Sequence, residues 1–266
     1  MDTPIALLLL GQSNAIANAE STGGTFHVTD QIKIYNAQSQ SLETLDLEHV
    51  AHLITDSSSV TGYNTIGGGK NNIMGGLAWR ILQETGRSVV VVCNGHGGEP
   101  FNRWIENGTS SENYVDLLAD VPTAISLAGI SSFDIVHIQE GEADAAGGDS
   151  QAQITAERNT LIAQLRAEPW IRSDTYFTVG EPCQSGLEVP ALYYLNWSVQ
   201  EVINDGDPYT CYVPTTGIPY VSETNKGHFS GQGLYDLGYF RVFGSLPAEA
   251  KVTPRPRPIL TSGIRF

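Results

Sequence analysis

The sequence predicts an α/β protein, a three-layer sandwich in which helices cover both faces of a mostly parallel sheet of about five strands. Two observations carry this prediction. Short runs of branched apolar residues, bounded by Gly, Asn or Ser, are typical of strands buried on both faces. Between them, apolar residues recur every three, four and seven positions, as on one face of a helix. This alternation favours parallel strands joined by right-handed crossovers.

Five segments have the composition of strands, and together they indicate a flavodoxin-like sheet. The first run, residues 4–10, leads directly into Gly-Gln-Ser-Asn. We interpret it as a buried strand rather than a signal peptide, because it lacks a basic leading segment and a small-residue cleavage site. A less apolar segment is expected nearer an edge of the sheet. In chain order, the expected strands span 4–10, 31–36, 88–94, 133–138 and 174–179.

Four segments have helical periodicity, and small polar residues stand at their expected ends. Gly86 and Gly206 follow the first and third segments, and Ser230 is in position to cap the last. The polar, glycine-rich stretch 55–72 is expected to be a loop. The helices are expected over 73–82, 154–165, 192–202 and 230–239.

One domain, residues 1–246, accounts for all these elements. From Pro247 the chain is expected to run extended over the surface as a C-terminal tail, 247–266, because three alternating prolines at 254–258 exclude a helix. We find no internal repeat, and no pattern reveals the oligomeric state.

The charge balance excludes several classes of partner. Fourteen Lys and Arg against 29 Asp and Glu give a net charge of -15, which opposes binding to nucleic acid or to an anionic membrane surface. No run approaches the ~20 apolar residues of a membrane span. The three cysteines permit one disulfide and demand none. Without a signal peptide the expected location is the cytoplasm by default, with export or association with a phage tail as alternatives.

Loops that follow strands are the expected place for chemistry, because ligands bind at the carboxyl edge of a parallel sheet. Three such loops are dense in glycine and polar residues: 11–14, 95–104 and 140–144. Ser13 stands between the first strand and a helix start. There it could serve as a nucleophile, since free helix N–H groups stabilise an oxyanion, or simply as a helix cap.

A nucleophile needs a base, and the six histidines differ in their surroundings. His228 lies in a tight loop before the last helix and is the first candidate, with His96 beside a glycine pair as the second. His137 falls inside an apolar strand and is expected in the core. The others, in polar segments expected at the surface, are His27, His49 and His52.

Four segments in order resemble the SGNH hydrolases, and more closely the branch of carbohydrate acetylesterases and sialate O-acetylesterase-like domains. They are Gly11-Gln12-Ser13-Asn14, Gly97-Gly98 followed by Trp104, Gly141-Glu142-Ala143-Asp144, and His228-Phe229. The resemblance spans residues 4 to about 244. It implies a serine esterase that removes O-acetyl groups from carbohydrate, acting on an O-acetylated glycan or a small acetyl ester.

The resemblance also implies roles for individual residues. Ser13 would attack the ester carbonyl and His228 would take its proton, forming an acyl-enzyme that water hydrolyses. The backbone N–H groups of Ser13 and Gly98 would hold the oxyanion, and Gln12, Asn14 and Glu142 would line the oxyanion and substrate site. No metal and no organic cofactor is implied.

Two positions depart from the family pattern. Asn225 stands three residues before His228, where the family has an acid. Glu223 could substitute, a carboxylate such as Glu142 or Asp144 could serve, or a backbone carbonyl could orient the histidine and leave a Ser-His dyad. Ala143 removes a side-chain donor to the oxyanion, for which Gln12 or Asn14 would compensate.

These departures keep two alternatives open: a lipid or aryl esterase on the same fold, and a catalytically impaired carbohydrate-binding protein. Three aromatic residues, Tyr63, Phe101 and Trp104, would form a platform for sugar rings or belong to the core. Glu140, Glu142 and Asp144 could form a metal cluster, but acidic residues in a glycine-rich loop are expected to be solvated.

Overall fold

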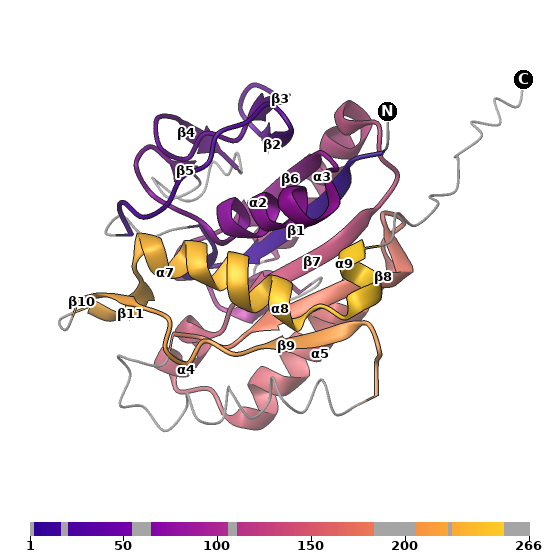
Figure 1. The fold of residues 1–266 in the computed structure, drawn as a ribbon. Coiled ribbons are helices and arrows are strands. Elements are labelled where there is room, and N and C mark those ends of the chain that lie inside the picture. The colour runs from indigo at the N-terminus through magenta and orange to yellow at the C-terminus, as the bar shows by residue number, and fades with distance from the viewer. Residues whose placement is uncertain are drawn as a thin grey trace, which may run out of the picture.

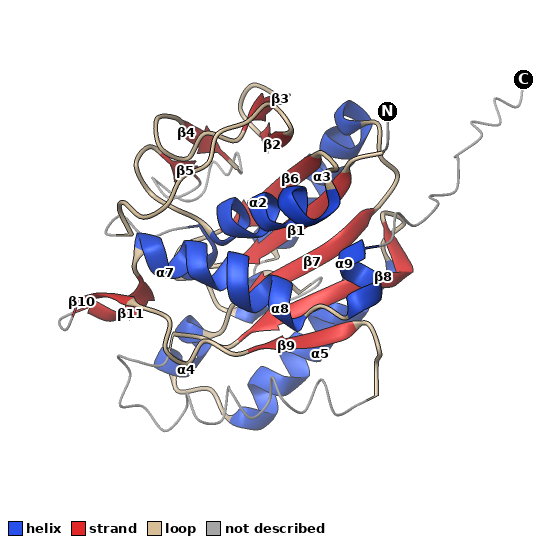
Figure 2. Cartoon of the chain, in the orientation of Figure 1, coloured by secondary structure: helices blue, strands red, loops and turns tan. Residues whose placement is uncertain are grey.

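A seven-stranded sheet forms the centre of the molecule (Figures 1 and 2). The computed structural model describes residues 3–16, 21–54, 65–105, 111–183, 206–222 and 225–252. The sheet has the order β3-β2-β6-β1-β7-β8-β9. Its strands are β1 (Ile5–Gly11), β2 (Ile32–Asn36), β3 (Ser41–Thr44), β6 (Val89–Gly95), β7 (Phe133–Gln139), β8 (Ile171–Gly180) and β9 (Thr210–Val213).

The sheet is parallel except at one edge, where β3 pairs antiparallel with β2. Numbered along the chain, the five strands β6, β1, β7, β8 and β9 have the flavodoxin order 2-1-3-4-5. β2 and β3 extend this arrangement on the β6 side. The predicted architecture is therefore correct, and the strand count is seven rather than about five.

β1 lies at the centre of the sheet and is buried along its whole length. Its run of leucines follows from this position, because successive side chains enter the apolar layers on opposite faces. Leu7 and Leu9 belong to one hydrophobic core, whereas Leu8 and Leu10 belong to the other.

Helices pack on both faces of the sheet and complete the three layers (Figure 1). The first face is covered by α2 (Ile73–Thr85), α7 (Gly231–Asp236), the π-helical turn η2 (Leu237–Val242), α8 (Phe243–Ser245) and α9 (Ala248–Val252). The second is covered by α3 (Glu112–Ala128) and α5 (Gln151–Ala167).

The caps expected from the sequence bound two of these helices. Gly86 ends α2 in the left-handed conformation with φ 66°. Ser230 begins α7, and its hydroxyl oxygen accepts a 3.0 Å hydrogen bond from the Gly233 N–H.

Short elements and hairpins lie outside the three layers. Three further short helical elements are α1 (Ser13–Ile16), η1 (Phe101–Arg103) and α4 (Glu142–Gly147). Two antiparallel hairpins accompany them: β4 (Ala51–Leu53) with β5 (Thr65–Gly67), and β10 (Tyr220–Ser222) with β11 (Asn225–Phe229).

The structure corrects the predicted elements in three places. Residues 65–67, expected in a loop, form β5 because they pair with β4. The beginning of the C-terminal tail was expected to be extended, but residues 248–252 form the helix α9, which packs against α2. A helix is possible there because the closely spaced prolines that exclude one begin only at Pro254. The pattern did not predict α3, whose interior contains Pro122. The expected helix 192–202 and the chain from 253 onward lie outside the described residues.

Membrane spans and disulfides can be assessed for the same residues. Among them, no helix combines the length and the apolar character needed to cross a bilayer. Cys93, Cys183 and Cys211, which all lie in the described part of the chain, form no disulfide with one another.

Candidate active site

Ser13 is placed by a sharp turn between β1 and α1. Gly11 makes this turn with φ 143°, a conformation that residues with a side chain rarely adopt. A Cβ atom at Gly11 would also lie 2.0 Å from the backbone oxygen of Gln139. Glycine is therefore required here, and the turn delivers a partly exposed Ser13 to the first position of α1.

His228 reaches the same place from the far end of the chain. It lies on β11, and its Nε2 atom is 2.8 Å from the Oγ atom of Ser13. This distance is within the range for proton transfer between a nucleophile and its base. The structure therefore brings together two residues that are 215 positions apart in the sequence.

Gly98 follows β6 in an exposed, left-handed turn with φ 75°. His96, the second candidate base, is fully buried two residues earlier. Its ring packs edge-on against Trp104, and its Nε2 atom is 3.6 Å from Oδ2 of Asp116. Burial lowers the pKa of His96 to about 4, so this ring is neutral at physiological pH and belongs to the interior.

Gln12, Asn14 and Glu142 form one buried hydrogen-bonded group around Ser13. Oε2 of Glu142 accepts a 2.5 Å hydrogen bond from Nε2 of Gln12, and Oε1 accepts a 2.7 Å hydrogen bond from Nδ2 of Asn14. Nδ2 of Asn14 also donates to the backbone oxygen of Gly227 at 3.0 Å. Both amide hydrogens of Asn14 are thus engaged by acceptors within the protein.

The acidic residues after β7 are buried rather than solvated, which corrects the sequence-based expectation. Glu140, Glu142 and Asp144 are each less than 9% exposed. Burial and the neighbouring carboxylates raise the pKa of Glu140 well above its usual value. Burial likewise raises the pKa of Asp144 to about 7, although its carboxylate accepts a 3.0 Å hydrogen bond from the Phe101 N–H.

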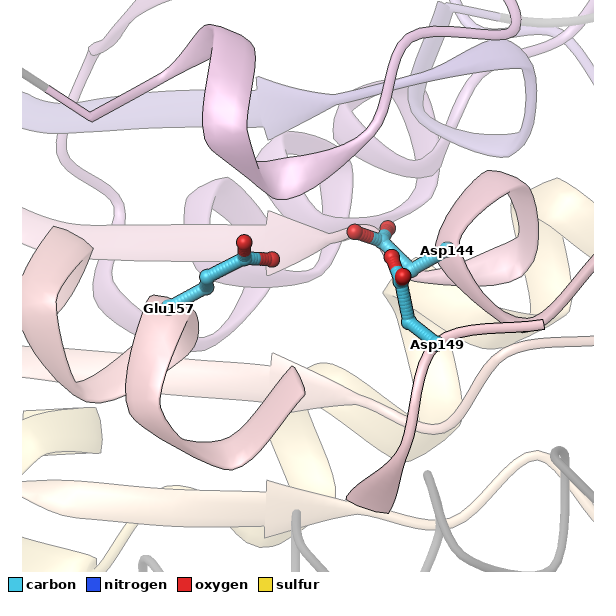
Figure 3. Close-up of side chains that lie close together, drawn as sticks. All are labelled: Asp144, Asp149 and Glu157. Carbon is cyan, nitrogen blue, oxygen red and sulfur yellow. The ribbon is translucent and has the colours of Figure 1, made fainter. Parts of the chain in front are cut away.

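Asp144 also belongs to a second acidic group, with Asp149 and Glu157 (Figure 3). One carboxylate oxygen from each lies within 4.8 Å of the others. Burial and the charge of Asp149 raise the pKa of Glu157, which shares a hydrogen bond with Asp144. Asp144 and Glu157 therefore retain their protons to higher pH than isolated carboxyls do.

The proposed sugar platform does not form from the two described aromatic residues. Phe101 and Trp104 are buried in the core between the sheet and the α3 and α5 layer. Tyr63 lies outside the described residues, as does Glu223, the candidate acid. Asn225 contributes backbone to β11.

The remaining histidines follow the expectation in two of four cases. His137 is buried in β7, where Nδ1 is 2.9 Å from the Thr178 hydroxyl, and His49 is exposed beside Asp46. His52 is buried instead of exposed, because its Nδ1 atom pairs with the Glu43 carboxylate at 3.0 Å. His27 is half-buried and stacks on Trp79.

Sequence reasoning missed the part that residues distant in sequence play in the site. The N–H of Cys183, after β8, donates to Oε1 of Glu142 at 3.2 Å. Asn72, the cap of α2, donates a side-chain hydrogen bond to the backbone oxygen of Ala15 in α1. Neither residue carries a signal in the sequence beyond its place next to an element end.

Compared by sequence, the chain matches no family model and no curated protein. Its fold is similar to that of NanS, with a TM-score of 0.65 and 15% identity over 90% of this chain and 95% of that chain. The fold is also similar to that of a protein from Arabidopsis thaliana, with a TM-score of 0.64 and 15% identity over 89% of this chain and 95% of that chain. A carbohydrate acetylesterase from Xanthomonas citri has a similar fold as well, with a TM-score of 0.60 and 14% identity over 90% of this chain and 55% of that chain. The chain therefore has the SGNH hydrolase-like fold that the four sequence segments imply.

Proposed function

We propose that this protein is a serine esterase that removes acetyl groups from O-acetylated carbohydrate. One observation carries the proposal: the Ser13 hydroxyl lies 2.8 Å from Nε2 of His228 at the edge of the sheet where β1 ends. The fold shared with a carbohydrate acetylesterase supports the substrate class. The proposed substrates are an O-acetylated glycan or a small acetyl ester.

The proposed reaction has two half-steps. His228 takes the Ser13 proton as Oγ attacks the ester carbonyl, and the resulting oxyanion accepts hydrogen bonds from the backbone N–H groups of Ser13 and Gly98. The C–O bond to the alcohol then breaks, and His228 returns the proton to the leaving oxygen. Water, deprotonated by His228, attacks the acetyl-serine in the same way and releases acetate.

We propose that Ser13 and His228 act as a pair, with Glu223 as the remaining candidate for a carboxylate that orients the imidazole. Two other carboxylates that were candidates from the sequence have hydrogen-bond partners elsewhere, which supports Glu223 as the candidate. Glu142 is engaged by Gln12 and Asn14, and Asp144 accepts its hydrogen bond from the Phe101 backbone.

Hydrolysis of para-nitrophenyl acetate by the wild type and by Ser13→Ala tests the proposal. We expect Ser13→Ala to lower kcat by about 1000-fold or more, because the nucleophile and its base act as a unit. Ser150→Ala is the matched control, since Ser150 caps α5 and lies outside the proposed site. Equal activity in the wild type and Ser13→Ala would refute the esterase assignment.

A butyrate ester measured alongside separates an acetylesterase from a lipid or aryl esterase. The proposal expects faster hydrolysis of the acetate. If the wild type neither hydrolyses these esters nor reacts with an organophosphonate at Ser13, the carbohydrate-binding alternative replaces the enzyme.

A further inference from the structure

The side chain of Asn14 binds the strand that carries His228 on both sides of that residue. Its Nδ2 atom donates to the backbone oxygen of Gly227 at 3.0 Å, and its Oδ1 atom accepts from the Phe229 N–H at 3.1 Å. The amide therefore pairs with β11 as a neighbouring strand would. Because Asn14 directly follows Ser13, these two bonds set the position of the base relative to the nucleophile.

Glu142 favours the same direction of that amide as the Gly227 carbonyl and the Phe229 N–H do. Its Oε1 atom can only accept a hydrogen bond, so it selects the Nδ2 end of Asn14, at 2.7 Å. With the amide reversed, Oδ1 would face the carboxylate and Nδ2 would face the Phe229 N–H. Both contacts would then be repulsive, and β11 would lose its two bonds.

The same carboxylate also holds the residue on the other side of Ser13. Oε2 of Glu142 accepts from Nε2 of Gln12 at 2.5 Å, and Oε1 accepts from the Cys183 N–H at 3.2 Å. Glu142 is 8% exposed, and Gln12 and Asn14 are 2% or less exposed. Hydrogen bonds to a charged group are strong, and exclusion of water strengthens them further.

We infer that Glu142 and Asn14 are positioning residues for the reaction, with Gln12 as the third member of an amide clamp around Ser13. This inference rests on the proposed function. The clamp touches neither the ester nor the reacting proton: Glu142 orients Asn14, and Asn14 sets the distance between Ser13 and His228. Because a misplacement of about 1 Å can lower a rate by about 100-fold, disruption of the clamp should lower kcat and leave KM nearly unchanged.

Asn14→Asp is the sharpest variant, since it changes one NH₂ group to an oxygen at the same position. The new oxygen faces the Gly227 carbonyl and the Glu142 carboxylate, all three of which are acceptors. We expect kcat for para-nitrophenyl acetate and the rate of organophosphonate labelling of Ser13 to fall by about 100-fold. For Glu142→Gln, kcat and the labelling rate should fall by less than about tenfold, because the side-chain amide of Gln12 can turn so that its oxygen accepts a hydrogen bond from the new NH₂ group.

The double variant Asn14→Asp with Glu142→Gln tests the coupling. Here the glutamine NH₂ can donate to the aspartate, so we expect the double variant to be about tenfold faster than Asn14→Asp alone. If Asn14 and Glu142 acted independently, the two losses would multiply. Thr175→Val is the control, since it removes a buried hydrogen bond to the backbone oxygen of Phe133 from the first half of β8, the strand that ends before Cys183.

The outcomes separate this inference from the proposed function. A wild type that neither turns over the ester nor becomes labelled contradicts the function itself. An active wild type with a folded Asn14→Asp variant within threefold of its rate overturns the inference, as does a double variant that is no faster than Asn14→Asp alone. If Asn14→Asp does not fold, Asn14→Ala takes its place, and a labelling rate within threefold of wild type again overturns the inference.

Discussion

The Asp144 carboxyl group is 1% exposed, yet it lies within reach of two other carboxyls. Burial raises its pKa from the usual 3.8 to about 7, and the charges of Glu157 and Asp149 act in the same direction. The folded protein therefore binds this proton more tightly than the unfolded chain does. Asp144 lowers stability as pH rises from about 4 to about 7, the window between the two pKa values.

Asp144→Asn should remove this pH dependence, because the amide stays neutral and its oxygen still accepts from the Phe101 N–H. We expect the variant to gain stability relative to the wild type as pH rises from 4 to 7. Urea unfolding at pH 4.5 and pH 7.5 measures the difference, with the exposed Asp30→Asn as control. A stability difference that stays constant between the two pH values would contradict the assignment.

At the level of residues, sequence patterns could predict the pair Ser13 and His228 but not the burial of the acids. The pair follows from four ordered segments at strand ends. The burial of Glu142 and Asp144 depends on the Cys183 loop and on the Phe101 turn, which contact them from elsewhere in the chain. A local, glycine-rich acidic sequence contains no sign of those contacts.

The start of α2 links two elements of the site. Oδ1 of Asn72 accepts from the Met74 N–H at 2.8 Å, and its Nδ2 atom donates to the backbone oxygen of Ala15. The cap of one helix thereby supports the short helix that begins with Ser13. Since Asn72 is fully buried, water cannot replace either bond.

Asn72→Ala should destabilise the fold by about 2–4 kcal/mol, the sum of a lost cap and a lost buried hydrogen bond. Ser150→Ala, which removes only an exposed cap, should cost about 1 kcal/mol. Chemical denaturation of both variants provides the comparison. Equal losses would show that the bond to Ala15 contributes nothing to stability.

Elements with a strong periodic signal were predicted, and weak or interrupted ones were not. β1 and β6 are runs of branched apolar residues, so their burial is visible in the sequence. β3 and β9 have only four residues each. Neither strand is buried along its whole length, and neither sequence is a continuous run of apolar residues. In α3, Pro122 and the exposed Val115 and Leu118 interrupt the one-faced pattern.

For the whole molecule, alternating strands and helices were enough to predict the three layers, because right-handed crossovers leave few arrangements. The pairing of β2 with β6 rather than with β1 could not be read from the pattern. The connection from β1 to β6 contains β2, β3, β4, β5 and α2, so the chain adds β2 and β3 at the edge of the sheet before β6 pairs with β1.

The net charge of -15 produces repulsion across the folded molecule. Salt screens this repulsion, so NaCl raised from about 20 mM to about 300 mM should raise the midpoint of urea unfolding at pH 7.5. Near the isoelectric point of 4.6 the same addition should have little effect. A midpoint at pH 7.5 that does not move with salt would contradict the prediction.

Protein synthesis delivers the proposed nucleophile, Ser13, long before the proposed base, His228. Ser13 leaves the ribosome 215 residues before His228, and β11 follows only after the seven strands of the central sheet have been made. A nascent chain that stops before residue 228 contains a serine with no histidine beside it. The proposed ester chemistry therefore starts only once the last hairpin has been synthesised and has closed onto α1.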